Sequence, residues 1–256
     1  MITIKNISRY KAASIHLAIS AGIAVLVLSV MLALWYPLEL FRGMGGAQLI
    51  MLIVGVDVII GPLITLIIFN TSKKELVFDL AVVAALQIAA LCYGVYAMHA
   101  GRPVFTVFTD HQLVVVTAAE IDPEELAKAR IEEFRSLSQT GPKLVATEPP
   151  TDPGELSNIA FAGLAGLGIQ HLPRYYVPYA GKREQILKAS RPLTDLKPTP
   201  HDSKKLESYV QRSNRKLEEL RCLPVQTKLA LLTAIVDAHS GELLDILDIR
   251  PDITPR

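Results

Sequence analysis

A single acidic residue, Asp57, lies inside the apolar stretch of residues 47–69, and this position makes it the first candidate for chemistry. A helix needs about 20 apolar residues to cross the hydrocarbon core of a bilayer, so the stretch qualifies as a transmembrane helix with Asp57 near its middle. A charged carboxylate at that depth costs about 2.5–3.5 kcal/mol on insertion scales unless it is paired, protonated or hydrated. The sequence therefore predicts that Asp57 has a partner or a task inside the membrane.

Three interpretations of Asp57 stay open at this point. In the first, its carboxylate bonds His16, Gln87 or Tyr93 within a bundle of this chain's own helices, as intramembrane polar groups usually do. In the second, it meets a polar or cationic group on a visiting helix. In the third, it handles a proton or an ion. One acid is too few for an aspartyl intramembrane protease, because such a site needs two carboxylates.

Small residues and a proline surround Asp57 along the same stretch. Pro62 lacks a backbone N–H and leaves the carbonyl oxygen of Val58 without its helical partner, so we expect a kink. Gly55 and Gly61 have no side chains and allow another helix to approach closely. Asp57, Gly61 and Pro62 are therefore the candidate partner-binding residues of this stretch.

The stretch around Asp57 is the second of three apolar segments, which span residues 12–36, 47–69 and 80–98. Each has a length and composition typical of a transmembrane helix. The first is longer than the apolar core of a signal peptide, which spans about 7–15 residues, so we expect it to be retained. Residues 43–46 (GMGG) separate the first two segments and predict a flexible hinge.

Basic residues near the ends of the apolar segments predict the topology. The segments are preceded in turn by Lys5, Arg9 and Lys11, by Arg42 (offset by Glu39), and by Lys73 and Lys74. Because Lys and Arg concentrate in cytoplasmic loops, we expect a cytoplasmic N-terminus and an exported segment after the third crossing. In a bacterium this describes a multi-pass inner-membrane protein with a periplasmic C-terminal domain.

The rest of the chain has the composition of a water-soluble domain. Six of the 26 Lys and Arg residues and four of the 25 Asp and Glu residues precede residue 102, which leaves 20 and 21 after it. We therefore expect a membrane anchor over residues 1–101 and a single domain over residues 102–256. The formal net charge of +1 argues against nucleic acid as a partner, because phosphate binding needs a basic excess.

Strand and helix signals alternate in residues 102–256. Residues 103–108 and 112–117 flank a short polar turn and predict a hairpin, and residues 227–236 and 243–249 around Gly241 predict a second one. The other expected elements are helices from Asp122 to about Ser136, over residues 154–167 and within the charged residues 182–220, and a strand over residues 143–147. The predicted fold class is α+β, a three-helix transmembrane N-terminal anchor followed by an exported α+β domain with an antiparallel sheet.

The densest aromatic patch of the exported domain spans residues 174–179 (RYYVPY). In one interpretation the tyrosines cover the edge of the core and keep their hydroxyl groups in water. In the other, Arg174, Tyr175, Tyr176 and Tyr179 form a peptide-recognition surface, since Tyr and Arg are favoured interface anchors.

No pattern in the exported domain specifies catalysis. Its histidines lack metal-ligand spacing, and Cys222 is its only cysteine, which we expect to be a buried, inert thiol. His239 and Ser240 fit a hairpin turn better than a nucleophile elbow, because the glycine two residues before the serine is absent. We therefore expect no catalytic residues, no metal and no cofactor.

Several pieces along the chain together resemble the TfpX/TfpZ family of type IV pilin accessory proteins. These pieces occur in order over nearly the whole chain and are residues 9–17, 34–37, 54–66, 78–81, 93–96, 102–105, 134–137, 172–179, 223–224, 237–241 and 248–251. The third of them contains Asp57 and the Gly61–Pro62 pair. No single piece is decisive, but the series on a three-helix anchor is quite specific.

The resemblance implies an inner-membrane protein that works with a particular type IV pilin and aids its stability or assembly, without enzymatic activity. The implied partners are the major pilin, through its transmembrane helix and its head domain, the pilus assembly machinery and the lipid bilayer. On this view Asp57, Gly61 and Pro62 contact the pilin helix, and Arg174, Tyr175, Tyr176 and Tyr179 bind the pilin head.

Two other function classes remain open on sequence grounds. One is a transporter or intramembrane enzyme that uses Asp57, for which three helices and one acid are a poor basis. The other is a membrane-anchored periplasmic module that binds a ligand or acts as a scaffold.

Overall fold

The computed structural model describes residues 7–164 and 166–251 and divides into two compact units. We call them the helical unit (Met1–Ala33 and Gly46–Ala100) and the sheet unit (Leu34–Gly45 and Gly101–Arg256). Residues 34–45, which join the first two apolar segments, thus belong to the sheet unit.

The helical unit contains three helices long and apolar enough to cross a membrane, as the sequence predicts. The first comprises α1 (Arg9–Val30) and a π-helical end (Met31–Trp35), the second α3 (Gly46–Ile53), η3 (Val54–Ile60) and α4 (Gly61–Ile68), and the third α5 (Leu76–Ala100). Ser8 caps the first helix by accepting a hydrogen bond from the Lys11 N–H.

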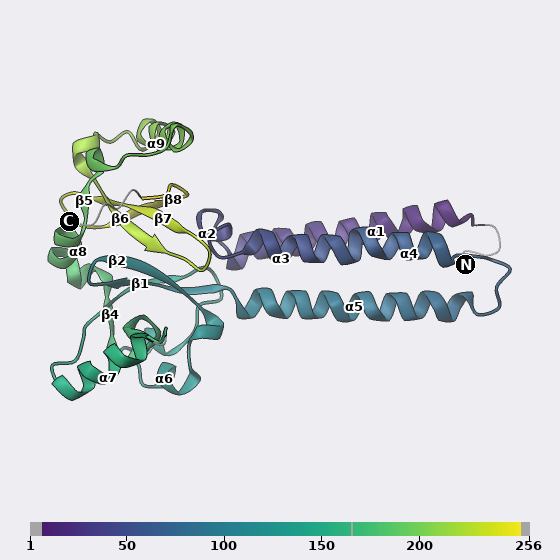
Figure 1. Cartoon of the computed structure of the whole chain (residues 1–256), viewed down its shortest axis with the longest axis horizontal. Helices are drawn as coiled ribbons and strands as arrows, with labels where there is room; N and C mark the ends of the chain where they lie inside the picture. Colours follow the sequence, from purple (N-terminus) through teal and green to yellow (C-terminus); the bar gives the residue numbers. More distant parts are fainter. Residues whose placement is uncertain (1–6, 165, 252–256) are drawn as a thin grey trace. The chain divides into compact units, whose positions relative to one another are not determined.

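The second span packs against both of the others, as Figure 1 shows for α1, α3, α4 and α5. Gly94 of α5 permits a close approach to the second span, because a Cβ atom at Gly94 would lie 3.1 Å from the Ile53 side chain. Large apolar side chains such as Val25, Ile67 and Leu86 point away from the bundle and are exposed, as is expected of surfaces that face lipid.

The backbone around Asp57 is π-helical. The N–H of Gly61 donates to the carbonyl oxygen of Val56, five residues earlier, and Pro62 follows directly. The irregularity predicted from Pro62 is therefore a π-helical turn over Val54–Ile60, one of the recognised sources of helix kinks.

The sheet unit is built on one sheet with the strand order β4-β3-β1-β2-β6-β7-β8, and β5 pairs with β6. The strands are β1 (Pro103–Thr109), β2 (Gln112–Thr117), β3 (Lys143–Thr147), β4 (Tyr176–Pro178), β5 (Arg191–Pro192), β6 (Leu220–Gln226), β7 (Leu231–Asp237) and β8 (Leu243–Leu247). Both predicted hairpins, β1–β2 and β7–β8, are confirmed.

The sheet is mixed rather than purely antiparallel. β1 pairs with β3, and β2 with β6, in parallel. The chain between the members of each pair is long and contains other strands, and parallel pairing requires such a long connection. The β2–β6 pairing spans only two residue pairs, Leu113 with Val225 and Val114 with Gln226. This short ladder joins two halves of the sheet, each of which has its own core.

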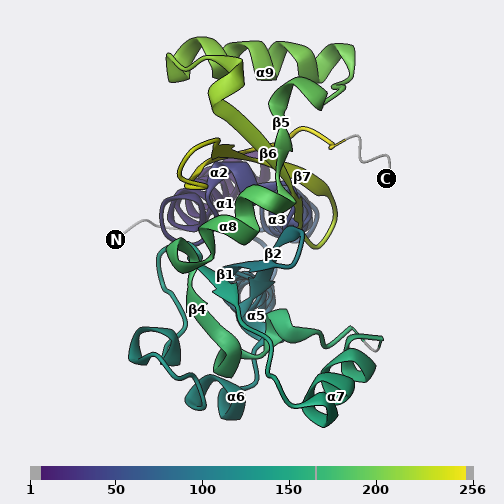
Figure 2. The same cartoon turned by 90° about the vertical axis from the view of Figure 1, so that its left-hand side faces the viewer.

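The first core contains Phe105, Phe134 and Tyr176, and the second contains Tyr209, Leu220 and Ile235. The helices of the sheet unit are α2 (Leu38–Phe41), α6 (Pro123–Ala127), α7 (Pro153–Leu164), α8 (Arg183–Ala189) and α9 (Pro200–Ser213). Figure 2 shows α6 and α7 on the side of β1 and β4, and α9 on the side of β5, β6 and β7. The shorter 3₁₀ turns are Ala118–Glu120, Glu132–Arg135, Ile169–His171, Pro173–Tyr175, Tyr179–Lys182, Leu193–Asp195 and Leu217–Glu219.

Two sequence predictions for the sheet unit were wrong in extent. The helix that starts after its Asp122 N-cap ends at Ala127 rather than near Ser136, because the chain turns to bury Phe134 in the first core. The charged residues 182–220 contain helices, but β6 begins at Leu220 and was not predicted.

Residues 43–45 were predicted as part of a hinge, but they are buried and hydrogen-bonded within the sheet unit. The carbonyl oxygen of Gly43 accepts from the Thr227 hydroxyl group and from the Leu229 N–H, each at 2.9 Å. Tyr36 and Leu40 of the same segment are also buried. The loop between the first two spans is therefore docked on the sheet unit.

We expect the stability of the sheet unit to fall at acidic pH because of Asp237 in the β7–β8 turn. Asp237 accepts hydrogen bonds from the Ser240 and His239 N–H groups at 2.8 and 2.9 Å and pairs with Arg215, and these bonds hold its pKa well below the usual range. An unfolded aspartate has a pKa of about 3.9. The charged native Asp237 therefore stabilises the fold above that value, and this contribution is lost as the pH falls further.

Urea unfolding of the full chain in detergent at a series of pH values checks this expectation. The stability difference between the wild type and Asp237→Asn should be constant above about pH 5 and should shrink below about pH 4. A difference that does not change with pH would contradict the assignment.

Candidate functional site

Asp57 is buried within the helical unit, with 6% of its surface exposed. Within the described part of the chain, neither of its carboxylate oxygens has a hydrogen-bond partner. An unpaired buried carboxylate is unusual, because buried polar groups are nearly always bonded.

None of the three side chains that the first interpretation paired with the Asp57 carboxylate forms a hydrogen bond with it. His16 Nδ1 lies 2.7 Å from Thr65 Oγ1, and Gln87 Nε2 donates to the main-chain oxygen of Asp57 at 3.3 Å. Tyr93 points outward and is 67% exposed. No hydrogen bond from these three side chains to the carboxylate is therefore formed among the residues described, although His16 and Gln87 line the same cavity as Asp57. A role of Asp57 toward a visiting helix, or toward a proton or an ion, stays a prediction.

Two adjoining cavities open between α1 and α5, with the second span beneath them. One, of about 180 Å³, is lined by His16, Ile19, Ser20, Ile23, Asp57, Ala84, Gln87, Ile88 and Leu91. The other, of about 350 Å³, shares His16, Ile19, Ala84 and Gln87 with it and extends to Ala12, Thr65 and Leu80. Because they share these walls, we treat them as one feature, the α1–α5 groove.

Gly61 and Pro62 are both buried against this chain's own helices. A Cβ atom at Gly61 would lie 1.8 Å from Gln87 Nε2, so the glycine makes room for a side chain of α5. A role for Gly61 and Pro62 toward a partner stays a prediction.

The aromatic segment of residues 174–179 contributes mainly to the core of the sheet unit. Tyr175, Tyr176 and Tyr179 are each at least nine-tenths buried. Their hydroxyl groups donate to the Glu155 carboxylate, the Gln170 carbonyl oxygen and the Gly241 carbonyl oxygen, respectively. The hydroxyl groups are thus bonded within the protein rather than in water.

Burial raises the pKa of all three tyrosines of this segment. The pKa of Tyr175 rises to about 12. Arg174 is the more accessible residue of the four candidates, and it pairs with Glu125 at 3.1 Å and lies over the Tyr175 ring. A binding role for this segment stays a prediction, and Arg174 is the residue best placed to test it.

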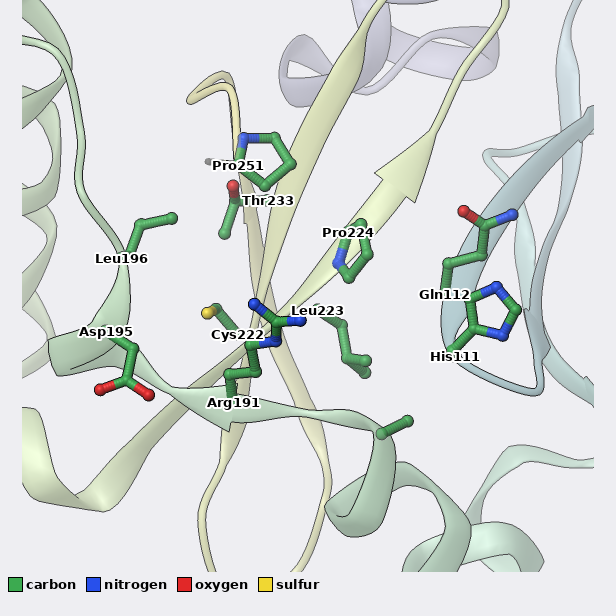
Figure 3. A pocket seen from close by; sticks show the side chains of 11 residues that line it. His111, Gln112, Arg191, Asp195, Leu196, Cys222, Leu223, Pro224, Thr233 and Pro251 are labelled. Carbon is green, nitrogen blue, oxygen red and sulfur yellow. The ribbon is translucent and has the colours of Figure 1, made fainter. Parts of the chain in front are cut away.

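The sheet unit has its own pocket of about 190 Å³, which no sequence pattern indicated. Figure 3 shows Arg191 and Cys222 in the middle of its lining, with His111 of the β1–β2 turn and Gln112 of β2 on one side and Asp195 on the other. These residues come from distant segments of the chain, which explains why a motif search missed them.

We expect the Cys222 thiol in this pocket to react slowly. Burial raises its pKa to about 11, compared with about 8.5 for a free cysteine. Since the thiolate is the reactive form, maleimide labelling at pH 8 should be about a hundredfold slower in the folded chain than in urea. The measurement uses a Cys92→Ser background, and equal rates in both states would contradict the assignment.

Among residues 7–164 and 166–251, no group of three or more His, Cys, Asp or Glu side chains is arranged to hold a metal ion. The candidate features are separate: the α1–α5 groove with its carboxylate belongs to the helical unit, and Arg174 and the pocket around Arg191 belong to the sheet unit.

Comparison with known proteins places the chain among fimbrial assembly proteins. It is 31% identical to the fimbrial assembly protein of Dichelobacter nodosus serogroup I over 248 aligned residues. The alignment covers 95% of this chain and 92% of that protein. The chain belongs to the fimbrial assembly protein FimB family. The FimB family model itself matches residues 5–38.

Two more members of the family were found in the same organism. The serogroup E1 fimbrial assembly protein is 29% identical over 248 residues, which is 95% of this chain and 92% of that protein. The protein of serogroups C1 and C2 is 34% identical over 121 residues, 46% of this chain and 92% of that protein. No solved structure matches the chain. These relatives confirm a fimbrial assembly family and support a role in fimbrial assembly, whereas the finer TfpX/TfpZ assignment stays a prediction.

Proposed function

We propose that this FimB-family chain is an inner-membrane accessory protein that binds a type IV pilin and promotes its stability or its assembly into fimbriae. The observation that carries the proposal is the likeness to a fimbrial assembly protein along 95% of the chain, which includes both units. A pilin in the membrane has one apolar helix and a globular head outside. A partner for it needs a surface within the bilayer and a folded surface outside, and a chain with three spans and a sheet unit has both kinds of surface.

The proposed role is non-catalytic and needs no cofactor. The basic residues before the first and third spans support a cytoplasmic N-terminus and a periplasmic sheet unit. On this arrangement the pilin head meets the sheet unit, and the assembly machinery in the same membrane receives the pilin.

Purification of the tagged full-length chain from native membranes in mild detergent tests the proposal. We expect a type IV pilin to be the dominant stoichiometric partner by mass spectrometry, and to be absent from an untagged control strain. Deletion of the gene should lower the amount of pilin or of fimbriae, and complementation should restore it. If pilin is absent even after crosslinking in cells, the proposal fails.

The alternative of a membrane-anchored ligand-binding module has one observation in its favour, the pocket around Arg191. A small molecule that co-purifies with the full chain, and is lost in Arg191→Ala while pilin binding is unchanged, would favour it.

A further inference from the structure

The α1–α5 groove extends along about three turns of α1 and α5. Its walls run from Ala12 to Ile23 on α1 and from Leu80 to Leu91 on α5. Eleven residue steps of α-helix correspond to about 16 Å, or three turns. Because the middle span packs against both walls from beneath, a further helix laid in the groove would complete a four-helix arrangement.

The chemistry of the groove limits what fills it. Its walls carry apolar side chains such as Ile19, Ile23, Ile88 and Leu91, which suit an apolar helix. Its floor carries the Asp57 carboxylate, which is more than nine-tenths buried and has no hydrogen-bond partner among the described residues. Lipid chains would match the walls but would leave the carboxylate unpaired in hydrocarbon, which is costly.

The polar side chains of His16 and Gln87, which line the groove with Asp57, each form a hydrogen bond to another group. His16 is bonded to Thr65, and Gln87 to the main-chain oxygen of Asp57. A donor or cation carried by an occupant of the groove would supply the hydrogen bond that the carboxylate lacks among the described residues.

We propose that the α1–α5 groove binds the transmembrane helix of the pilin, and that this helix presents a cationic or hydrogen-bond-donating group to the Asp57 carboxylate. This inference rests on the proposed function and adds to it a site and a charge requirement.

Crosslinking from paired positions of the full-length chain, expressed with its pilin, tests the site. A photoreactive residue is placed at Ile19 or Ile88, which line the groove, or at Val25 or Leu86. The latter two are also exposed but line neither cavity, so they serve as matched controls. We expect adducts with the pilin helix from the groove positions at about ten times the yield of the controls.

Two substitutions test the chemistry. Asp57→Asn should lower the amount of co-purified pilin about tenfold, the expected effect of losing a hydrogen bond to a charged group. Ile19→Trp should block the groove and have a similar effect, whereas Val25→Trp should have none. If Asp57→Asn lowers the amount of the chain in the membrane, the comparison of Ile19→Trp with Val25→Trp still tests the groove.

The outcomes separate the two proposals. If the wild type captures pilin, but the adducts do not favour the groove and neither Asp57→Asn nor Ile19→Trp weakens capture, the groove assignment is overturned and the proposed function stands. Groove adducts with a second copy of this chain instead of the pilin overturn it as well. If the wild type captures no pilin, the proposed function fails and the groove assignment fails with it.

Discussion

Replacing Tyr176 by alanine should lower the free energy of unfolding of the sheet unit by about 3–5 kcal/mol, the range for removing a buried aromatic ring. The Tyr176 side chain is fully buried, and its ring packs edge-on against Phe105 and Phe134, with centroids 5.0 and 6.4 Å apart. Its hydroxyl group donates to the Gln170 carbonyl oxygen. The substitution removes all three interactions and leaves a cavity in the first core.

Urea unfolding of the full chain in detergent, followed by pulse proteolysis, measures this loss. Tyr176→Phe keeps the ring and should cost about 1 kcal/mol, the value of one hydrogen bond. Tyr96→Ala is a matched control, because Tyr96 is 68% exposed and lies in the helical unit. If Tyr176→Ala is as stable as the wild type, the ring does not belong to the core.

This stability effect determines how binding by residues 174–179 has to be tested. Simultaneous alanine substitution of the three tyrosines would disturb the core and a partner surface alike, so a loss of binding would not identify an anchor. Arg174→Ala removes a partly exposed ion pair, whose contribution to stability is within about 1 kcal/mol. A loss of pilin binding in that variant would therefore support a surface at Arg174.

The sequence was sufficient for features that depend on local composition. The three spans follow from runs of apolar residues, and the two hairpins from β-rich runs around turns such as that containing Gly241, whose φ of +71° suits glycine. Both kinds of signal lie within a short window of residues, and the structure confirms them.

Features that depend on distant residues could not be predicted. β6 carries Pro224, which is a poor strand former, and it is held in the sheet by β2, β5 and β7. Asp57 was singled out from its depth in an apolar run, but its lack of a bonded partner depends on the positions of His16 and Gln87. The α1–α5 groove combines side chains of three helices and has no signature in any one of them.

The Gly43 loop is the clearest case of a distant contact, because Gly43 and Thr227 are 184 residues apart. A Cβ atom at Gly43 would lie 2.6 Å from Thr227 Oγ1, which is too close for any side chain. We therefore expect Gly43→Ala to destabilise the sheet unit by about 2 kcal/mol through overpacking. Thr227→Ala should cost a similar amount, because it removes the buried hydroxyl group that donates to the Gly43 carbonyl oxygen.

Combining the two substitutions distinguishes this contact from an unspecific effect. The double variant lacks the Thr227 hydroxyl group that the methyl group introduced by Gly43→Ala would meet, so its loss of stability should be smaller than the sum of the single losses by about 1 kcal/mol. Gly181→Ala is the matched control in the same unit, since a Cβ atom there would meet nothing within 4 Å. Urea unfolding of the full chain measures all four variants. Strict additivity of Gly43→Ala and Thr227→Ala would mean that the two positions are not in contact, and it would contradict the packing of this loop against the turn before β7.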